Sequence, residues 1–253
     1  MAKIFITGSA DGLGLLAAKL LVGQGHDVVL HARNEERGRH ALSKVPGAEK
    51  VLTADLSSGE DTKWLAAEVN AIGGFDAVIH NAGVYQTSGK LTFAVNTLAP
   101  YILTCLIQKP KRLIYISSGM HLQGDSNLEK LSNTIDRISY SDSKLHLLIL
   151  TMAVARKWQQ VYANAVDPGW VPTKMGGSAA PDNLEKGFQT QAWLAVSNEH
   201  QAKVSGHYFY HQKQKYSLPV AGDVNAQEKF LILCEQISGV HFPADQQRTA
   251  SNT

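Results

Sequence analysis

The chain has 253 residues, 44% of them hydrophobic, and a formal net charge of +2 at pH 7. This length and apolar content suffice for one large α/β domain, and the small net charge argues against a nucleic-acid-binding protein. No stretch approaches the ~18 uninterrupted apolar residues of a membrane span, and the first apolar run lacks a secretory signal. Cys105 and Cys234 are far apart in the sequence and form no Cys-x-x-Cys motif, so we expect both to be free thiols in a reducing cytoplasm. Together these features predict a soluble, cytoplasmic protein.

The first predicted element is a short buried strand, Lys3 to Thr7, which runs directly into a glycine-rich loop. The loop has the spacing Gly-x-x-x-Gly-x-Gly, and a helical pattern follows from Leu15 to about Gln24. Backbone amides of such a loop bind a pyrophosphate, and glycines are needed where side chains would block its approach. This context predicts a dinucleotide site formed by Gly8, Ser9, Asp11, Gly12, Leu13 and Gly14. The alternative is a glycine-rich turn without a ligand.

The second predicted strand, Asp27 to Leu30, is followed by His31-Ala32-Arg33-Asn34. A site for NAD usually presents a carboxylate here to the ribose hydroxyls, whereas NADP needs a cation for its 2′-phosphate. Arg33 therefore favours NADP(H), with NAD(H) as the other option. Arg33 could instead form only an ion pair with Glu36. Asp11 in the glycine loop weakens the inference of NADP(H), because a second cation at that place would favour binding of the 2′-phosphate.

The third predicted strand, Lys50 to Thr53, ends in Ala54-Asp55-Leu56, where Asp55 could accept from the adenine amino group. Asp55 could equally cap the helix expected from about Ser58 to Asn70. The fourth strand, Phe75 to His80, ends in the small residues Asn81-Ala82-Gly83, which let a cofactor lie across the sheet. Strands alternating with helices predict a doubly wound, mostly parallel sheet with ligands at its carboxyl edge.

The fifth predicted strand, Arg112 to Ser117, carries Ser118 at its end, and an intervening segment leads to Tyr140-Ser141-Asp142-Ser143-Lys144. An apolar run up to Ala155 follows and predicts a helix, in which Tyr140 and Lys144 share one face. A cation beside a phenol, whose ordinary pKa is ~10, favours the ionised form. Such a pair is suited to moving a proton on or off an alcohol oxygen.

The sixth predicted strand, Tyr162 to Val166, precedes Asp167-Pro168-Gly169, and residues 176–186 are expected to form a mobile lid over a substrate. A last strand over 206–210 gives about seven strands, and a final helix is expected over 224–237. We therefore predict a single domain over residues 1–243, with helices on both faces of the sheet, and a flexible tail over 244–253.

Several motifs occur together in the order of one protein family. They are Thr7-Gly8-x-x-x-Gly12-x-Gly14, Asn81-Ala82-Gly83, Asn96, Ser118, Tyr140-x-x-x-Lys144 and Pro168-Gly169. In these motifs the chain resembles the classical short-chain dehydrogenase/reductase family, which has a Rossmann fold. The segment Trp170 to Met175, taken with Ser205 to Phe209, looks most like the retinol-dehydrogenase-like and WW-domain-oxidoreductase-like branch. That branch implies NADP(H) and an apolar aldehyde, ketone or alcohol.

The resemblance also implies roles for single residues. Tyr140 would be the general acid or base, and Ser118 would stabilise the negative charge that develops on the substrate oxygen. Lys144 would lower the pKa of Tyr140 and hold the nicotinamide ribose, while Asn96 would position a water. The nicotinamide carboxamide would contact the Val171 backbone and the Thr173 hydroxyl. Each role has a structural alternative: Ser118 could cap a turn, Asn96 could cap its helix, and Lys144 could lie on the surface.

Other classes of function have weaker support. No His-x-x-x-His or His/Cys ligand set occurs, so no metal is implied. Gly-x-Ser-x-Gly is missing as well, which argues against a serine hydrolase. A non-catalytic NAD(P)-binding regulatory or interaction protein on the same scaffold remains as the alternative to an oxidoreductase. Because the helix after Lys144 is apolar on nearly every side, we also expect a homodimer or homotetramer.

Overall fold

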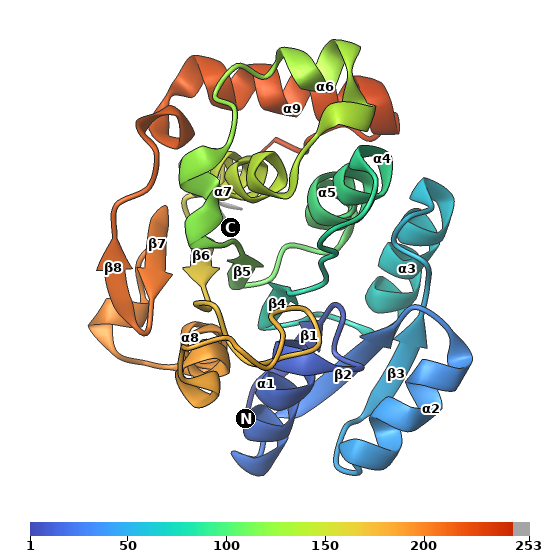
Figure 1. Ribbon diagram of the computed structural model, residues 1–253. Coiled ribbons are helices and arrows are strands. Elements are labelled where there is room, and N and C mark those ends of the chain that lie inside the picture. Colours follow the sequence, from blue (N-terminus) through green and yellow to red (C-terminus); the bar gives the residue numbers. More distant parts are fainter. Residues whose placement is uncertain (245–253) are drawn as a thin grey trace, which may run out of the picture.

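The computed structural model describes residues 1–244, which form an α/β fold around one eight-stranded sheet (Figure 1). The expected tail over 244–253 lies outside these residues, apart from Ala244. The strand order is β3-β2-β1-β4-β5-β6-β7-β8, and every pairing is parallel except that of β7 with β8. The strands are β1 Lys3–Ile6, β2 Asp27–Ala32, β3 Lys50–Thr53, β4 Ala77–His80, β5 Arg112–Ile116, β6 Tyr162–Asp167, β7 His207–Tyr210 and β8 Lys213–Lys215.

The predicted doubly wound sheet is confirmed, with one more strand than the seven expected. β8 consists of three exposed residues, Lys213 to Lys215, without an apolar alternation that could reveal it. It turns back against β7 through His211 and Gln212, which both have positive φ angles. Pairing with an existing strand, a tertiary contact, is what makes this polar segment extended.

Helices cover both faces of the sheet (Figure 1). One face carries α1 Gly12–Gly23, α2 Glu35–Lys44 and α8 Leu184–Val196, and the other carries α3 Gly59–Ile72, α5 Ala99–Leu106 and α7 Tyr140–Lys157. The last helix, α9 Val224–Ser238, packs outside α7, and the short helices α4 Gly89–Phe93 and α6 Glu129–Asn133 lie near the same side.

The central strands are buried on both faces, which explains their continuous apolar sequences. In β1, Phe5 joins the core beneath α3, α5 and α7, while Ile4 and Ile6 join the core beneath α1, α2 and α8. All three side chains are fully buried. The carboxyl edge of this sheet is therefore a rigid platform for the loops that follow each strand.

Helix α7 begins at Tyr140 because a capping box fixes its first turn. The Ser139 hydroxyl accepts from the Asp142 backbone N–H (3.1 Å), and the Asp142 carboxylate accepts from the Ser139 N–H (2.9 Å). This start places Tyr140 and Lys144 one turn apart, as the sequence predicts. Helix α1 begins at Gly12, earlier than the expected Leu15, because the Asp11 side chain caps it by accepting from Gly12 N–H (2.9 Å).

The apolar faces of α7 are covered within the chain, which removes the reason for expecting an oligomer. Residues 141–151 of this helix are all buried, and they pack against β5, β6 and the C-terminal helix α9. The expected homodimer or homotetramer stays a prediction without this support. Within residues 1–244, no helix combines the length and apolar character needed to cross a membrane.

Candidate active site

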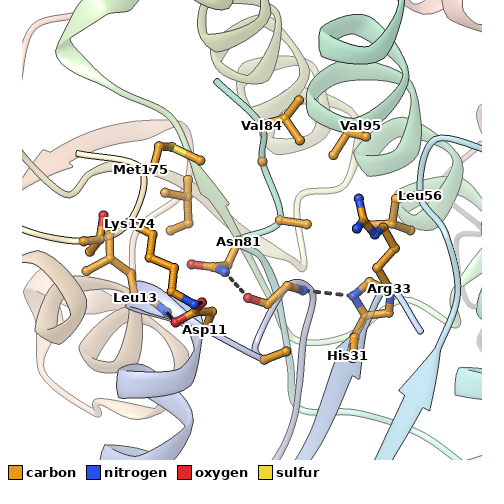
Figure 2. Close-up of a pocket in the computed structure, with 18 of the residues that line it drawn as sticks. Asp11, Leu13, His31, Arg33, Leu56, Asn81, Val84, Val95, Lys174 and Met175 are labelled. Carbon is orange, nitrogen blue, oxygen red and sulfur yellow. Dashed lines mark hydrogen bonds and ion pairs between the residues drawn. The ribbon is translucent and has the colours of Figure 1, made fainter. Parts of the chain in front are cut away.

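The glycine loop lies at the carboxyl edge of the sheet and is braced by the buried His31 of β2 and the half-buried Asn81, which follows β4 (Figure 2). The Gly8 N–H donates to Nδ1 of His31 (2.9 Å), and the Asn81 amide donates to the carbonyls of Thr7 and Gly8 (both 3.0 Å). His31 Nε2 lies 3.1 Å from the Ala54 carbonyl and must donate to it, so the ring is neutral with Nδ1 free to accept. Burial lowers the pKa of His31 to about 4, which preserves this state at neutral pH.

Two glycines of the loop are required by close packing, and a third faces open space. A Cβ at Gly14 would stand 2.7 Å from the Gly8 carbonyl oxygen and would also meet the Asn81 amide, while one at Gly8 would stand 2.7 Å from Ala82 Cα. Gly12, with φ +54°, has no atom within 4 Å of its Cβ position and lines a cavity of about 630 Å³. The loop is thus tight beneath and open above, as a phosphate cradle requires.

Most predicted cofactor residues line this cavity. They are Gly8, Asp11, Gly12, Leu13, Arg33, Asp55, Leu56, Asn81, Ala82, Gly83, Tyr140, Lys144, Pro168 and Thr173. Ser9 and Gly14 are buried beneath the loop instead. The Ser9 hydroxyl donates to the Ile6 carbonyl (2.9 Å) and accepts from His31 N–H (2.8 Å), so its role is structural.

Arg33 and Arg37 provide positive charge at one end of the cavity. Asn34 caps α2 by accepting from Arg37 N–H (3.0 Å), and this turn places both arginines at the end of β2. Among residues 1–244, Arg33 forms no ion pair with Glu36 or with another carboxylate. Its guanidinium is exposed and available to a ligand.

Asp55 does not cap the following helix. Ser58 caps α3, while Asp55 accepts from the backbone N–H (2.9 Å) and the hydroxyl (2.8 Å) of Ser57. These hydrogen bonds and the nearby positive charge of Arg33 outweigh burial and lower the pKa of Asp55. Asp55 is therefore an ionised acceptor at the wall of the cavity.

Asp11 is neutralised by two cations, one of which comes from a distant loop. Lys174 Nζ lies 2.6 Å from the Asp11 carboxylate and Arg37 lies 3.8 Å from it. Figure 2 shows Lys174 reaching towards Asp11 on one side of Asn81, with Arg33 on the other side. The hydrogen bond from Lys174 lowers the pKa of Asp11. No local pattern predicts this ion pair, because Asp11 and Lys174 are far apart along the chain.

Lys144 is a buried residue, with 3% of its surface exposed, and not a surface lysine. Its Nζ donates to the Ile116 carbonyl (2.7 Å) and lies 5.2 Å from the centre of the Tyr140 ring. Burial lowers the pKa of Lys144 to about 8, although the negative charge of Asp167 acts in the opposite direction and raises it.

The pKa of Tyr140 lies above its ordinary value, so the expected shift towards neutrality by Lys144 is not the dominant influence in this structure. Burial raises the pKa of Tyr140, and the negative charge of Asp167 and the neighbouring Tyr85 phenol raise it further, while Ser118 opposes them. Tyr85 meets the Tyr140 ring edge to face, with ring centres 4.9 Å apart. Tyr140 is thus protonated at neutral pH, which suits a proton donor.

Asn96 is buried in a stretch of π-helix, residues 94–98, and does not cap a helix. Its side chain accepts from Val84 N–H (2.8 Å) and donates to the Val84 carbonyl (2.9 Å) and the Ser143 hydroxyl (3.1 Å). A Cβ at Gly83 would lie 3.5 Å from both Asn96 Oδ1 and Lys144 Nζ, so Gly83 separates these two polar groups. π-Helical turns often occur at functional sites.

Ser118 has the structural role that the sequence left open and also lines a second cavity. Its hydroxyl caps the 3₁₀ turn Gly119–Gln123 by accepting from Met120 N–H (3.2 Å). The second cavity, of about 900 Å³, is lined by Ser118 and Tyr140 and by the predicted residues Leu13, Pro168, Gly169, Val171 and Thr173.

Segment 168–183 connects β6 to α8 and forms the outer wall of the second cavity. The Val171 carbonyl accepts from Thr173 N–H (2.8 Å), and the Thr173 hydroxyl accepts from Gly176 N–H (3.2 Å). Trp170 and Met175 are 58% and 45% exposed. Segment 168–183 lacks helix and strand, whereas residues 184–186 of the expected lid (176–186) belong to helix α8. The mobility of the lid stays a prediction. Within residues 1–244, no group of three or more His, Cys, Asp or Glu side chains could hold a metal ion.

Comparison with known proteins agrees with this geometry. The family model described as short-chain dehydrogenase matches residues 2–184. An uncharacterised oxidoreductase of Emericella nidulans is 46% identical over 256 residues, covering 96% of this chain and 99% of the relative. Human retinol dehydrogenase 14 is 27% identical over 290 residues, covering 94% of this chain and 86% of the relative.

Solved structures show the same fold. A protein from Mycobacterium paratuberculosis superimposes with a TM-score of 0.79 at 23% identity, covering 96% of this chain and 95% of that one. A blue fluorescent protein from a metagenomic library, crystallised in complex with NADPH, gives a TM-score of 0.69 at 19% identity, covering 82% of this chain and 95% of that one.

Proposed function

The chain belongs to the short-chain dehydrogenase family, and from this premise we propose that it uses NADPH to reduce an apolar aldehyde or ketone, with Tyr140 as the proton donor. It lies on the retinol-dehydrogenase-like branch of the family and is an NAD(P)-dependent oxidoreductase that acts on CH–OH or C=O groups. We further propose that residues 1–243 act as one catalytic unit. The cytoplasmic location and the homo-oligomer remain predictions.

One observation carries the proposal: the two cavities meet at Tyr140. The cavity of about 630 Å³ extends from Arg33 and Arg37, past the glycine loop, to Tyr140 and Lys144. The cavity of about 900 Å³ is lined by the same Tyr140 and by Trp170, and Met175 lines both cavities. A dinucleotide in the first cavity and a carbonyl compound in the second would therefore both contact this residue.

The residues of the first cavity fit a nicotinamide dinucleotide. Gly12 leaves open space where a side chain would stand, next to the N-terminus of α1, and Asp55 offers an acceptor at the opposite wall. When bound, NADPH supplies a hydride to the carbonyl carbon.

The chain's own groups would handle the proton and the charge. Tyr140 is protonated because its pKa is raised, so it can donate a proton to the carbonyl oxygen, and Ser118 can hydrogen-bond the same oxygen. Lys144 lies beneath the Tyr140 ring, where a positive charge stabilises the tyrosinate left after proton transfer. Asn96 and Lys144 flank Gly83, which supports a relay that returns a proton to Tyr140.

Preference for NADP(H) is supported by Arg33 and Arg37. Both line the cavity, and Arg33 has no carboxylate partner within residues 1–244. An exposed guanidinium is suited to a phosphate monoester through paired hydrogen bonds. Binding of NADPH by the metagenomic relative of the same fold is consistent with this choice.

The test of cofactor choice is titration with NADPH and NADH, followed by nicotinamide fluorescence. We expect NADPH to bind at least about tenfold more tightly, and Arg33→Ala to remove most of this advantage. Arg39→Ala is the matched control, because Arg39 lies nearby on helix α2 and already pairs with Glu35 at 3.6 Å. Equal binding of the two cofactors by the wild type would refute the NADP(H) preference.

The test of catalysis is reduction of a panel of apolar aldehydes and ketones by the wild type and Tyr140→Phe. Loss of the proton donor should lower kcat by about 10²- to 10⁴-fold while NADPH still binds. If NADPH binds but no carbonyl compound is reduced, a non-catalytic NAD(P)-binding protein becomes the better account.

A further inference from the structure

Asp167 brings a carboxylate to the reaction site that the roles above do not use. It is the last residue of β6, where it pairs with Tyr210 of β7. The preceding residue, Val166, pairs with Ile116 of β5, so Asp167 lies beside the Ser117–Ser118 end of that strand. Asp167, Ser118 and Tyr140 line the same cavity of about 900 Å³.

The two carboxylate oxygens of Asp167 have different surroundings. Oδ1 accepts from Gly169 N–H (2.9 Å) and closes the turn after β6. Oδ2 faces Gly119, where a Cβ would stand 3.1 Å away. Among residues 1–244, no lysine or arginine pairs with Asp167, and the nearby Lys144 ammonium donates to the Ile116 carbonyl instead. One oxygen therefore has a structural task and the other faces the residue next to Ser118.

Groups around Asp167 confirm that its charge is felt at the reaction site. Tyr140, Tyr208 and Lys144 all respond to it: the Asp167 charge raises the pKa of each. Burial raises the pKa of Tyr140 and of Tyr208 more than the Asp167 charge does. For Lys144, burial lowers the pKa and outweighs the opposing effect of the Asp167 charge.

The wall behind Asp167 is polar and incompletely hydrogen-bonded. His121 Nδ1 donates to the Ser118 carbonyl (2.8 Å), so its Nε2 is an acceptor, and this atom is buried without a partner in residues 1–244. The Tyr208 hydroxyl is likewise buried and has no hydrogen-bond partner in this part of the chain, but it is close enough to the Asp167 carboxylate to interact with it. The Tyr208 ring lies 4.9 Å from the His121 ring, centre to centre. Buried polar atoms are rarely left unpaired in a native protein unless a ligand or water serves them.

We propose that Asp167 is a specificity residue that selects carbonyl substrates carrying a hydrogen-bond donor, a hydroxyl, N–H or ammonium, on the carbon next to the carbonyl. The inference rests on the proposed function, since Ser118 and Tyr140 must hold the carbonyl oxygen. Because Oδ2 faces Gly119, the residue next to Ser118, a donor on the carbon beside the C=O group is the one best placed to meet it. The rest of the substrate would contact the apolar side chains of Met120, Trp170 and Met175.

The physical reason is the desolvation of the carboxylate. Among largely apolar carbonyl compounds, one without a donor displaces water from Asp167 and leaves the carboxylate unpaired, so it should be the poorer substrate. A substrate hydroxyl or ammonium replaces the lost water, so it is accepted where its methylated analogue is rejected. The rival account is that Asp167 only closes the turn through Gly169.

Asp167→Asn separates the two accounts, because an amide oxygen can still accept from Gly169 N–H while the charge is gone. The probes are α-hydroxyacetophenone, α-aminoacetophenone and α-methoxyacetophenone with NADPH. For the wild type, kcat/KM should be at least about tenfold higher for the hydroxy than for the methoxy ketone. In Asp167→Asn this ratio should fall to less than about threefold, with the largest loss for the amino ketone.

Asp182→Asn is the matched control, since Asp182 lines the same cavity but its Oδ2 accepts from Trp170 N–H (2.6 Å). This variant should keep the wild-type ratio. Equal kcat/KM for the hydroxy and methoxy ketones in the wild type overturns the inference and leaves the proposed function standing. NADPH binding without reduction of any of the three ketones also overturns it. Failure to bind NADPH would sink the proposed function itself, and the inference with it.

Discussion

The two halves of the active site are built differently. At the dinucleotide end, the glycine loop is fixed by the buried His31, which accepts from Gly8 N–H, and by the half-buried Asn81, which donates to the Gly8 carbonyl. At the substrate end, segment 168–183 has neither helix nor strand, and it exposes 58% of Trp170. Its anchors are few, such as the hydrogen bond from Trp170 N–H to Asp182.

This difference matches two tasks. A cofactor whose chemistry does not vary can be bound by one preformed, tightly packed loop, in which a single added Cβ would clash with neighbouring atoms. A substrate pocket on an irregular segment can change shape and chemistry without disturbing the sheet. Changes at the dinucleotide end should therefore affect folding and cofactor affinity together, whereas changes at the substrate end should affect only turnover of particular substrates.

Among single substitutions, the largest expected effect on folding stability is at Gly14, and Gly14→Ala tests how tight the dinucleotide end is. The added Cβ meets the Asn81 amide and the Gly8 carbonyl, so we expect about 1–3 kcal/mol of lost stability and at least about tenfold weaker NADPH binding. Urea unfolding and fluorescence titration measure the two effects. Gly23→Ala, in the same helix with no atom within 4 Å of its Cβ position, should be neutral or slightly stabilising. Similar behaviour of both variants would disprove the tight loop.

Acid should act on the body of the protein, through several buried histidines at once. Burial lowers the pKa of His31 to about 4, of His80 to about 3 and of His146 to about 4. Since the unfolded chain binds protons at these sites from about pH 6.5 downwards, stability is complete above that pH. It should fall by up to about 1.4 kcal/mol per pH unit for each histidine as the pH drops towards 4.

Urea midpoints at pH 7.0, 5.5 and 4.5 measure this loss. His31→Gln should reduce the slope, because an amide oxygen can accept from Gly8 N–H without titrating, while the exposed His200 offers a control, His200→Gln, that should leave the slope unchanged. A midpoint that stays constant over this range would contradict the neutral, buried state of these histidines.

The ion pair between Asp11 and Lys174 links the two halves, and its variants should have opposite signs. Lys174→Met leaves the Asp11 carboxylate less neutralised beside the phosphate cradle, so NADPH affinity should fall by about two- to fivefold. Asp11→Asn still caps α1 and frees Lys174 and Arg37 for phosphate, so affinity should rise by a similar factor. The effects should shrink with added salt. Changes in the same direction would show that the pair does not act through charge.

The smallest effect is expected at Trp170. Trp170→Ala removes an exposed wall of the substrate cavity, so KM for bulky apolar ketones should rise by about two- to tenfold while NADPH affinity is unchanged. Trp64→Ala is the control, because Trp64 is 51% exposed on α3 and does not line either cavity. A loss of NADPH affinity in Trp170→Ala would show that the two halves are not separable.

Local sequence patterns were enough to predict the doubly wound sheet and most of the dinucleotide site. The strand-loop-helix context around Gly8, Gly12 and Gly14 marked the cradle, and the Tyr140-x-x-x-Lys144 spacing on a helix placed both side chains on one face. These features depend on neighbours in the chain, such as the capping box at Ser139, so residue order alone determines them.

Only the tertiary structure determines which distant residues contact the site and how burial and charge shift the pKa values of its side chains. The partners of Gly8 and Asp11 come from β2 and from the loop after β6, and no local pattern links His31 or Lys174 to the glycine loop. The raised pKa of Tyr140 depends first on burial, and then on Asp167 from a separate strand. Burial and long-range charge are properties of the packed molecule, because they arise only when segments distant in sequence exclude water from one another.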